Sequence, residues 1–334
     1  MDHTPGPYHE GSLAVQRRTG ALGAAAHVGR SIGSGIKPVA AAFLGLQPML
    51  VLAAADGSGR MWASLLTGPP GFLKATGSST VSVAGGLPEH DPLAAALARG
   101  PVPAGTIVLD PRTRRRMRMG GTVRPSARGL LLETERVFAN CPKYLQRREL
   151  RTTGDGDTPP VVRVRRGERL TPGQEAFLRA ADTFFVATGT PDGVDASHRG
   201  GGPGFLEVAS PTELSWPDYP GNAMFLTLGN LERDPRAGLL LLDWTTGTTL
   251  QLTGTARTEH TPDGGRTVRF TVTGTLQADG ASPLRWSAPE YSPANPPVDT
   301  CAPVTSADET GVESRGVRGV HTGRPGPARP LGGA

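Results

Sequence analysis

The sequence predicts a mainly β protein with short helices, of the α+β type, in which two similar domains follow one another. Three observations support this fold class. The 334 residues include 46 Gly and 32 Pro, as expected for many short strands joined by turns. The length fits two domains better than one. In addition, two separate blocks of sequence recur farther along the chain at one common spacing.

The repeated blocks indicate an internal duplication. Residues 62–72 and 195–205 share six of eleven residues, and residues 109–124 and 242–257 share six of sixteen. Both pairs lie 133 residues apart. A common offset in two blocks favours a duplicated domain. Chance similarity between turn-rich strands is the alternative, because Gly and Pro recur wherever strands turn.

The first copy begins with an apolar segment, residues 39–55, which we expect to be a helix running into a strand. This segment is shorter than the roughly 20 residues that a membrane-spanning helix needs. Farther on, Met117 and Met119 should face the core of a strand. Because side chains alternate along a strand, Arg116 and Arg118 should project from its opposite face.

The second copy contains a capping-box pattern at Thr171 and Gln174, which predicts a helix over residues 172–181. Residues 184–198 should form a β-hairpin, since an Asp-Gly turn dipeptide separates two short apolar runs. Residues 238–242 form a continuous apolar run that is typical of a buried strand.

These patterns divide the chain into five parts. We expect an N-terminal segment (1–37), a first domain (38–151), a linker (152–170), a second domain (171–298) and a disordered tail (299–334). The linker is polar and carries Gly and Pro, and the tail has lost periodic apolar residues.

Charge and cysteine content exclude several classes of protein. The net charge of +5 is too small to predict a polyanionic partner. Two cysteines do not make the disulfide framework of a secreted protein. Arg17 and Arg18 precede an alanine-rich run, but this run lacks the uninterrupted apolar core of an export signal. We therefore expect a cytoplasmic protein without membrane contact.

A candidate phosphate site lies in the second copy. Ser197, His198 and Arg199 precede a glycine-rich turn that begins with Gly200 and Gly201. Glycines expose successive backbone N–H groups that can bind an anion, and arginine and serine add further donors. A turn without a ligand is the alternative.

A second place for an anion follows at Asn222, a suitable N-cap for a helix over residues 223–231. The N-terminus of such a helix has spare N–H donors and a positive dipole end. Simple capping of the helix is the alternative role of Asn222.

At this point three runs carry a family resemblance: SHRGGGPGF, DYPGNAMFLTLGNLERDPRAGLLLLD and LQLTGTAR. They resemble the FMN-binding split β-barrel family related to pyridoxamine 5′-phosphate oxidase. In the first copy, HEGSLAVQRRTG, WASLLTGPPGF and NCPKYLQRRE resemble the N-terminal half of two-barrel members. The resemblance covers most of residues 8–298 and is most specific over residues 195–257. It implies two tandem split β-barrels, each six-stranded and antiparallel, which pair as a pseudo-dimer with a flavin held between them.

Positions carried over from the family place FMN on the second copy. On its phosphate side the resemblance puts Ser197, His198 and Arg199, with Tyr219, Asn222 and Asn230 nearby, while Gly200 and Gly201 are cofactor-binding candidates from the glycine-rich turn. This chain has Ala223 where relatives often have arginine. It also lacks the substrate residues of a true pyridoxamine phosphate oxidase, so we do not expect that specific activity.

The two copies differ at the candidate site. His198 and Arg199 correspond to Leu65 and Leu66 in the first copy, which cannot bind phosphate, so we expect one complete flavin site per chain. Trp62 could place a flat apolar surface against the flavin ring. A buried core tryptophan is the alternative.

Residues 141–144 follow a predicted strand and should open a short basic helix. Lys143 could contact a phosphate or the N1 and O2 edge of the flavin, where positive charge stabilises the reduced ring. Structural capping by Asn140 is the alternative. Cys141 could be a redox thiol, although free cysteines are more often small buried hydrophobes.

Five arginines within residues 112–118 form the strongest basic cluster, which we expect to be a solvated strand face. Nucleic-acid binding is not predicted, because no aromatic residues interleave with these arginines. No zinc-binding motif is present in the sequence, so no metal is expected.

Together these features predict an FMN-binding flavoprotein, an oxidoreductase that transfers hydride at flavin N5, with an unknown small-molecule substrate and an electron donor such as NAD(P)H. His198 is the candidate catalytic residue for proton transfer, because its charge can change near neutral pH. The alternatives are the deazaflavin F420 or haem in the same cleft, a flavin-binding module without turnover, and a nucleic-acid binder that uses the arginine strand. A homo-oligomer is left open.

Overall fold

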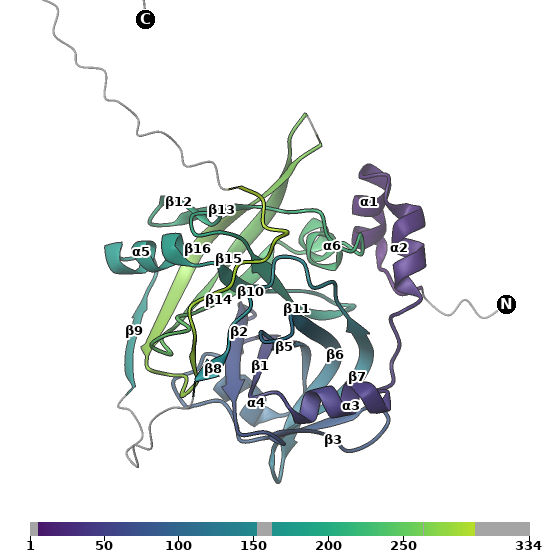
Figure 1. The fold of residues 1–334 in the computed structure, drawn as a ribbon, viewed down its shortest axis with the longest axis vertical. Helices are drawn as coiled ribbons and strands as arrows, with labels where there is room; N and C mark the ends of the chain where they lie inside the picture. The colour runs from purple at the N-terminus through teal and green to yellow at the C-terminus, as the bar shows by residue number, and fades with distance from the viewer. Residues whose placement is uncertain (1–5, 152–161, 263, 298–334) are drawn as a thin grey trace, which may run out of the picture. The chain divides into compact units, whose positions relative to one another are not determined.

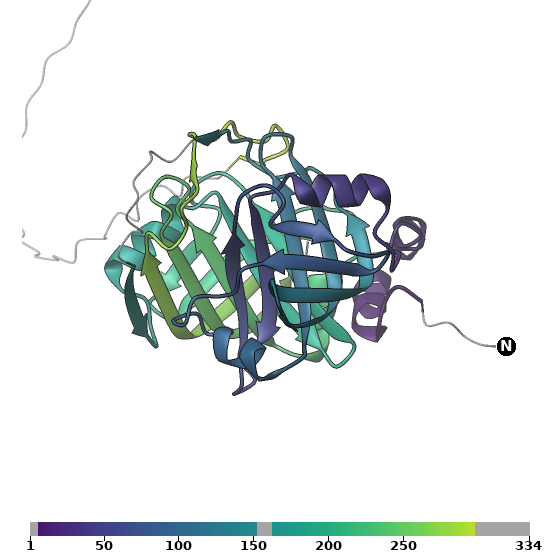
Figure 2. The same ribbon diagram turned by 90° about the horizontal axis from the view of Figure 1, so that it is seen from below.

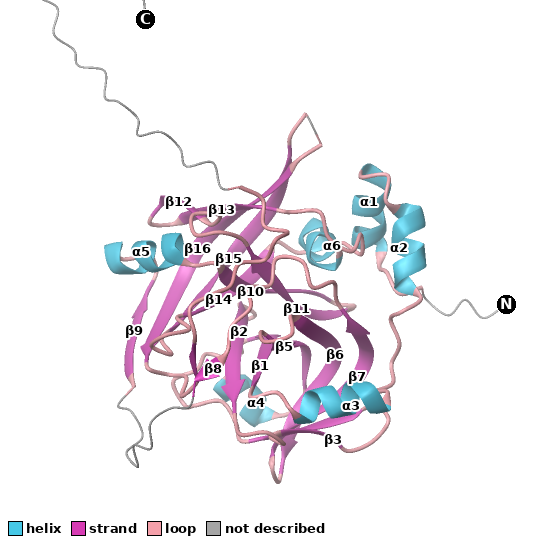
Figure 3. Cartoon of the chain, in the orientation of Figure 1, coloured by secondary structure: helices cyan, strands magenta, loops and turns pink. Residues whose placement is uncertain are grey.

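The computed structural model describes residues 6–151, 162–262 and 264–297. Two large antiparallel β-sheets and six short helices make up most of this part of the chain (Figure 1, Figure 3). The predicted fold class, mainly β with short helices, is therefore confirmed. The predicted tail, residues 299–334, lies outside the described residues.

The first sheet contains seven strands in the order β2-β1-β5-β6-β7-β4-β3. The strands are β1 (Met49–Ala55), β2 (Met61–Thr67), β3 (Leu73–Ala75), β4 (Thr80–Ala84), β5 (Val102–Asp110), β6 (Arg115–Ser126) and β7 (Gly129–Ala139). Helix α3 (Pro38–Gly45) leads into β1, as the apolar segment 39–55 predicts. Helix α4 (Ala94–Arg99) precedes β5.

The second sheet repeats this strand order as β11-β10-β14-β15-β16-β13-β12, and β9 pairs with β16 as an eighth strand. The strands are β9 (Arg163–Gly167), β10 (Thr183–Thr190), β11 (Gly193–Gly200), β12 (Glu207–Ser210), β13 (Glu213–Pro217), β14 (Arg236–Leu242), β15 (Thr249–His260) and β16 (Arg266–Asp279). Strand β4 and its counterpart β13 are offset by the same 133 residues as the sequence blocks. The repeated order agrees with the predicted duplication.

The sheets are more open than the resemblance implies. A six-stranded barrel in each half would require the outermost strands of a sheet to pair with each other. Among the described residues, each sheet instead runs as an open path from β2 to β3 or from β11 to β12. The fold is thus a split barrel whose sheets curve around their cores without a complete ring of strand pairs.

Each sheet has its own apolar core, and a third apolar cluster joins the sheets. Met117 and Met119 lie in the first core, and Leu250 and Leu252 lie in the second. The inward faces of β6 and β15 are therefore as predicted. The joining cluster brings β1 and β2 against β10, β11 and β14, so that the blue strands of Figure 2 lie beside green strands.

Two glycines allow the sheets to approach closely. A Cβ atom on Gly105 of β5 would lie 2.6 Å from the Cα atom of Asp195, and one on Gly238 of β14 would lie 2.6 Å from the backbone oxygen of Met61. These glycines are 133 residues apart, which is the offset of the repeat, so they occupy equivalent positions in the two halves. The contact between the halves is therefore approximately two-fold symmetric. One result is that β6 of the first sheet lies beside β11 of the second.

The remaining helices cover parts of the second sheet. Helices α1 (Glu10–Arg18) and α2 (Leu22–Gly29) lie beside α6 (Leu226–Arg233) in Figure 1. Helix α5 (Pro172–Ala180) has the predicted capping box between Thr171 and Gln174. The short strands β8 (Leu150–Arg151) and β17 (Arg285–Trp286) pair with each other. Within the described ranges, we find no helix with the length and apolar character needed to cross a membrane.

The hairpin predicted over residues 184–198 is present as β10 and β11, and the buried strand over residues 238–242 is part of β14. The linker prediction is wrong in part, because residues 163–167 form β9. This strand pairs with residues 275–279 of β16, the part of that strand that β13 does not reach. An unpaired strand edge readily accepts another strand.

Two predicted helix starts are also wrong. Residues 141–144 form a turn, because Tyr144 adopts a positive φ of 65° that a right-handed helix cannot contain. Helix α6 begins at Leu226 with Phe225 as its N-cap, rather than at Asn222. Ala223 and Phe225 have φ values of 62° and 52°, so regular helix cannot start before Leu226.

Candidate functional site

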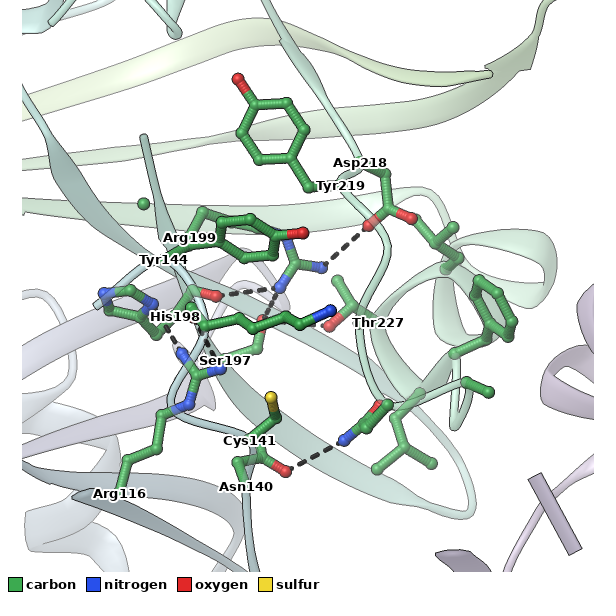
Figure 4. Close-up of a pocket in the computed structure, with 18 of the residues that line it drawn as sticks. Arg116, Asn140, Cys141, Tyr144, Ser197, His198, Arg199, Asp218, Tyr219 and Thr227 are labelled. Atoms are coloured by element: carbon green, nitrogen blue, oxygen red, sulfur yellow. Dashed lines mark hydrogen bonds and ion pairs between the residues drawn. The ribbon is translucent and has the colours of Figure 1, made fainter. Parts of the chain in front are cut away.

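A pocket lies where β11 of the second sheet meets β6 of the first, and we call it the basic pocket (Figure 4). The loop after β7, the loop between β13 and α6, and the first turn of α6 complete its walls. Its charged lining residues are Arg116, Arg118, Lys143, Arg199 and Asp218. Four cations and one carboxylate make the pocket strongly positive, and both halves of the chain contribute cations.

Strand β11 presents the predicted Ser197-His198-Arg199 run to the pocket. The strand ends at Gly200, where a Cβ atom would lie 1.9 Å from the backbone oxygen of Tyr144. Only glycine fits there, because the loop after β7 crosses the end of β11 at this point. The glycine therefore brings Tyr144 and its neighbours into the wall of the basic pocket.

Arg199 is held by neighbours on the second sheet. Its guanidinium donates hydrogen bonds to Ser197 Oγ at 3.3 Å and to the backbone oxygen of His198 at 3.1 Å. It also lies 3.7 Å from the carboxylate of Asp218, which is shared with Arg266 at 3.0 Å. Burial lowers the pKa of Arg199. Its Nε is buried and has no partner among the described residues, so Arg199 retains donor capacity.

Arg116 comes from the first sheet and is the least compensated of the three arginines. It donates to Nδ1 of His198 at 2.7 Å and to the backbone oxygen of Lys143 at 3.4 Å. Within the described part of the chain it has no carboxylate partner, and its buried Nε has no hydrogen bond. Burial, and then repulsion by Arg118 and Arg199, lowers the pKa of Arg116 to about 10. An unpaired guanidinium in such a place favours an anion as counter-ion.

Arg118 is paired inside the protein. It forms a buried salt bridge with Asp195, and its guanidinium lies 4.9 Å from the ring centroid of Phe138. The hydroxyl of Thr227, in the first turn of α6, donates to Ser197 Oγ at 3.0 Å. This network fixes β6, β11 and α6 relative to one another at the base of the basic pocket.

His198 is 94% buried, and its Nδ1 accepts the hydrogen bond from Arg116 because a guanidinium can only donate. Burial, together with repulsion by Arg116 and Arg199, holds the pKa of His198 well below its usual value. The imidazole is therefore neutral at neutral pH. The role of His198 in proton transfer stays a prediction.

The opposite wall is strained. Ala223 and Phe225 are two of four non-glycine residues with positive φ in the described chain, and Tyr144 is a third. Asn222 lines the pocket, accepts a hydrogen bond from the Met224 N–H at 3.1 Å, and donates to Asn140 at 3.1 Å. Backbone strain of this kind clusters at functional sites. The first turn of α6 follows this strained segment and lines the pocket. The N–H groups of a first helical turn have no intrahelical acceptor.

Two tyrosines form an aromatic edge. The rings of Tyr144 and Tyr219 have centroids 5.1 Å apart, and the Tyr144 hydroxyl donates to the backbone oxygen of Pro220 at 2.8 Å. Cys141 also lines the pocket, and Figure 4 shows its sulfur beside Asn140. Cys141 is partly exposed, so it is not the buried hydrophobe that its isolation in the sequence favours.

The structure brings together most of the predicted site residues. Seven of them line the basic pocket: Lys143, Ser197, His198, Arg199, Gly200, Tyr219 and Asn222. Gly201 follows the lining residue Gly200 and donates its N–H to the backbone oxygen of Asp182. Asn230 is buried away from the pocket, where it bonds His9 and Thr188. Trp62 lies in the first core and donates to Asp56, so it does not reach the basic pocket.

Arg116 and Arg118 are the site residues that sequence reasoning misses. They do project from the face opposite Met117 and Met119, but that face is not solvated as expected. It is covered by β11 of the other half. The available signal was the pseudo-dimer itself, since pairing of the two halves brings the arginine strand of the first copy against the His198 strand of the second.

The second half of this chain can be related to a known family. Residues 170–284 match the family model described as pyridoxamine 5′-phosphate oxidase. Residues 170–284 are therefore similar to the pyridoxamine 5′-phosphate oxidase family. This match confirms the resemblance stated from the sequence, and β11, the loop before α6, and α6 itself all lie within the matched residues. No curated protein matches the chain.

Several solved structures are similar to about a third of the chain. A conserved hypothetical protein from Mycobacterium tuberculosis is 18% identical, with a TM-score of 0.28 over 34% of this chain and 87% of that protein. The FAD-binding protein from Mycobacterium smegmatis is 14% identical, with a TM-score of 0.25 over 35% and 98%. A putative pyridoxamine 5′-phosphate oxidase from Listeria innocua is 12% identical, with a TM-score of 0.23 over 30% and 90%.

Proposed function

We propose that this chain binds FMN in the basic pocket and acts as a flavin-dependent oxidoreductase. The observation that carries the proposal is Arg116, a guanidinium at the base of the pocket with no carboxylate partner among the described residues. Arg116 is half-buried, and a ligand of opposite sign would supply the counter-charge that it lacks. The family match of the second half supports a flavin as the source of that anion.

The donor set fits a phosphate monoester. Asp195 pairs with Arg118, and Asp218 lies between Arg199 and Arg266, so Arg116 and Lys143 are the pocket cations left for a ligand. Two cations match the charge of a phosphate dianion. Arginine binds phosphate oxygens with forked hydrogen bonds, and the unpaired Nε atoms of Arg116 and Arg199 offer donors of this kind. The first turn of α6 adds backbone N–H groups.

Other parts of the pocket suit a flat aromatic ring. Tyr144, Tyr219 and Phe225 line the pocket and provide apolar ring surface beside the cationic base. When bound, a flavin supplies hydride transfer at its N5 atom, and the protein sets its orientation and electronic environment. In this chain Arg116, Lys143 and Arg199 would hold the phosphate, and the aromatic wall would limit access of water to the ring.

The test is the identity of the chromophore. Protein purified without added cofactor should be yellow and release FMN on denaturation, and NAD(P)H or another small donor should bleach the colour if the protein turns over. Release of F420 or haem would replace FMN in the proposal, and a yellow protein that no donor reduces would indicate a flavin-binding module. A colourless protein with no affinity for added FMN would contradict it. A cytoplasmic location remains part of this proposal.

A further inference from the structure

We propose that His198 is a positioning residue that holds the Arg116 guanidinium toward the bound anion, and that it acts as a neutral hydrogen-bond acceptor. This inference rests on the proposed function, because it assumes an anionic ligand at Arg116. It assigns His198 a role other than proton transfer, and it names a contact between the two halves of the chain as part of the binding site.

The geometry identifies the atom of His198 that accepts the hydrogen bond from Arg116. Nδ1 of His198 accepts the Arg116 hydrogen bond at 2.7 Å, so Nδ1 carries no hydrogen and Nε2 does. Nε2 is buried and has no partner among the described residues. The ring is also fixed by packing, with its centroid 5.9 Å from that of Phe185 in an edge arrangement. His198 therefore offers Arg116 one acceptor in one orientation.

The surroundings keep the ring in this state. The charged groups that act on His198 are Arg116 from β6 and Arg199 from its own strand, and both are cations. Protonation would place a third positive charge beside them and would remove the acceptor. Among the described residues, the Arg116 guanidinium has one other hydrogen-bond acceptor, the backbone oxygen of Lys143 at 3.4 Å. Without His198, the long Arg116 side chain would lose its closest contact and sample other rotamers.

This role makes a specific prediction about substitutions at position 198. In His198→Asn the side-chain oxygen can take the place of Nδ1, so the acceptor is kept and the imidazole is lost. In His198→Leu the acceptor is lost, and Leu65 occupies the equivalent position of the first sheet, so leucine is compatible with this strand. Far-ultraviolet circular dichroism and thermal melts would check that both variants fold.

The first experiment is calorimetric titration of the full-length protein with FMN and, separately, with inorganic phosphate. We expect His198→Asn to bind FMN within about threefold of the wild type and His198→Leu to bind about tenfold more weakly. In the Arg116→Thr background, His198→Leu should cause no further loss, because the two residues act as one unit. Equal losses in the asparagine and leucine variants, or additive losses in the double variant, would overturn the proposal.

The second experiment reads the ring directly. In nitrogen-15 NMR of histidine-labelled protein, His198 should show a protonated Nε2 and an unprotonated Nδ1 from pH 5.5 to 8. In Arg116→Thr its pKa should rise toward the usual value, because one repelling charge is gone. A His198 that titrates near pH 6.5 in the wild type would refute the positioning role. If the wild type binds neither FMN nor phosphate, the proposed function fails, and the NMR result still decides the state of His198.

Discussion

The basic pocket has a counterpart in the same chain, which we call the neutral pocket. It is formed by β2 of the first sheet and β15 of the second, together with the loop before α4. With the offset of 133 residues, the equivalent positions are Ser197 and Ser64, His198 and Leu65, Arg199 and Leu66, Arg116 and Thr249, and Arg118 and Gln251. Each of the three arginines in the basic pocket is thus replaced by a neutral residue, while the serine is kept.

Three polar side chains at the neutral pocket, Ser64, Asp91 and Gln251, form hydrogen bonds with one another. Asp91 accepts hydrogen bonds from Ser64 at 2.8 Å, from Gln251 at 3.1 Å and from the backbone N–H of Leu93 at 2.9 Å. Gln251 also donates to the backbone oxygen of Ala63 at 3.0 Å. In contrast, the basic pocket has buried donors that find no partner in the described part of the chain. The polar groups Asp91 and Gln251 of the neutral pocket thus have partners within the protein, whereas the basic pocket has hydrogen-bond donors that a ligand could use.

The comparison shows where a duplicated fold can specialise. Each pocket takes one strand from each half of the chain, so the neutral residues Thr249 and Gln251 on β15 and Leu65 and Leu66 on β2 affect one pocket alone. The other pocket keeps Arg116 and Arg118 on β6 and Arg199 on β11. A single chain can therefore retain one anion site without losing the symmetric packing between its halves.

The largest effect is expected when the basic pocket is given the residue of the neutral one. Arg116→Thr should weaken FMN binding by roughly 100-fold, because it removes the unpaired cation and its charge-assisted hydrogen bonds. Without ligand the same variant should stay within about 1 kcal/mol of the wild type in its free energy of unfolding, since Arg116 is half-buried and has no ion pair to lose. Calorimetric titration and chemical denaturation measure the two effects.

Thr249→Val is the matched control for Arg116→Thr, because Thr249 is the equivalent buried residue of the neutral pocket. It should leave FMN affinity unchanged. If the two variants lose the same affinity, the ligand does not distinguish the pockets, and the assignment of FMN to the basic pocket is wrong.

A smaller effect is expected at the second cation. Arg199→Ala should weaken FMN binding about tenfold, because Arg199 is partly compensated by Asp218 before any ligand binds. Asp218 keeps Arg266 as its partner, so the fold should survive. Arg115→Ala is the control, since Arg115 is exposed and lies over the ring of Phe43 rather than in the basic pocket. Fluorescence quenching of added FMN would measure both. Equal flavin retention in the two variants would count against the proposed phosphate contacts.

Much of the fold could be predicted from local signals. The capping box at Thr171 and the alternation at Met117 and Met119 each determine structure within a few residues, and the structure agrees with both. The duplication added the correspondence of His198 with Leu65. These inferences succeed because hydrophobic alternation and helix capping act over short distances.

The candidate site was harder, because its decisive contacts join distant segments. Arg116 and His198 are 82 residues apart, and the sequence alone does not show that β6 is covered by β11. The start of α6 was misplaced for a related reason: a polar residue before an apolar helical run predicts an N-cap at Asn222. The positive φ values of Ala223 and Phe225, which the surrounding structure imposes, move the start to Leu226.

The neutral pocket should also make the stability of the protein depend on pH, through Asp91. Burial raises the pKa of Asp91 in the neutral pocket, so its contribution to stability is present when the carboxyl is protonated and is lost as pH rises through that pKa. Asp91→Asn cannot ionise and lacks this loss. Relative to the wild type, its free energy of unfolding should therefore increase as the pH rises above about 4, the ordinary pKa of an aspartate, as measured by urea denaturation. A difference that stays constant across this range would show that Asp91 does not titrate in the folded protein.

The smallest effect concerns backbone strain, which the two pockets do not share. Ala223 has a φ of 62°, whereas His90, the equivalent residue beside the neutral pocket, is not among the described non-glycine residues with positive φ. Glycine accepts positive φ without steric cost but gives the unfolded chain more freedom. Ala223→Gly should therefore raise the free energy of unfolding by about 0.5 kcal/mol, and His90→Gly should lower it by a similar amount. If both variants are destabilised equally in chemical denaturation, the wall of the basic pocket stores no strain. The left-handed backbone that precedes α6 would then be the relaxed conformation of this segment.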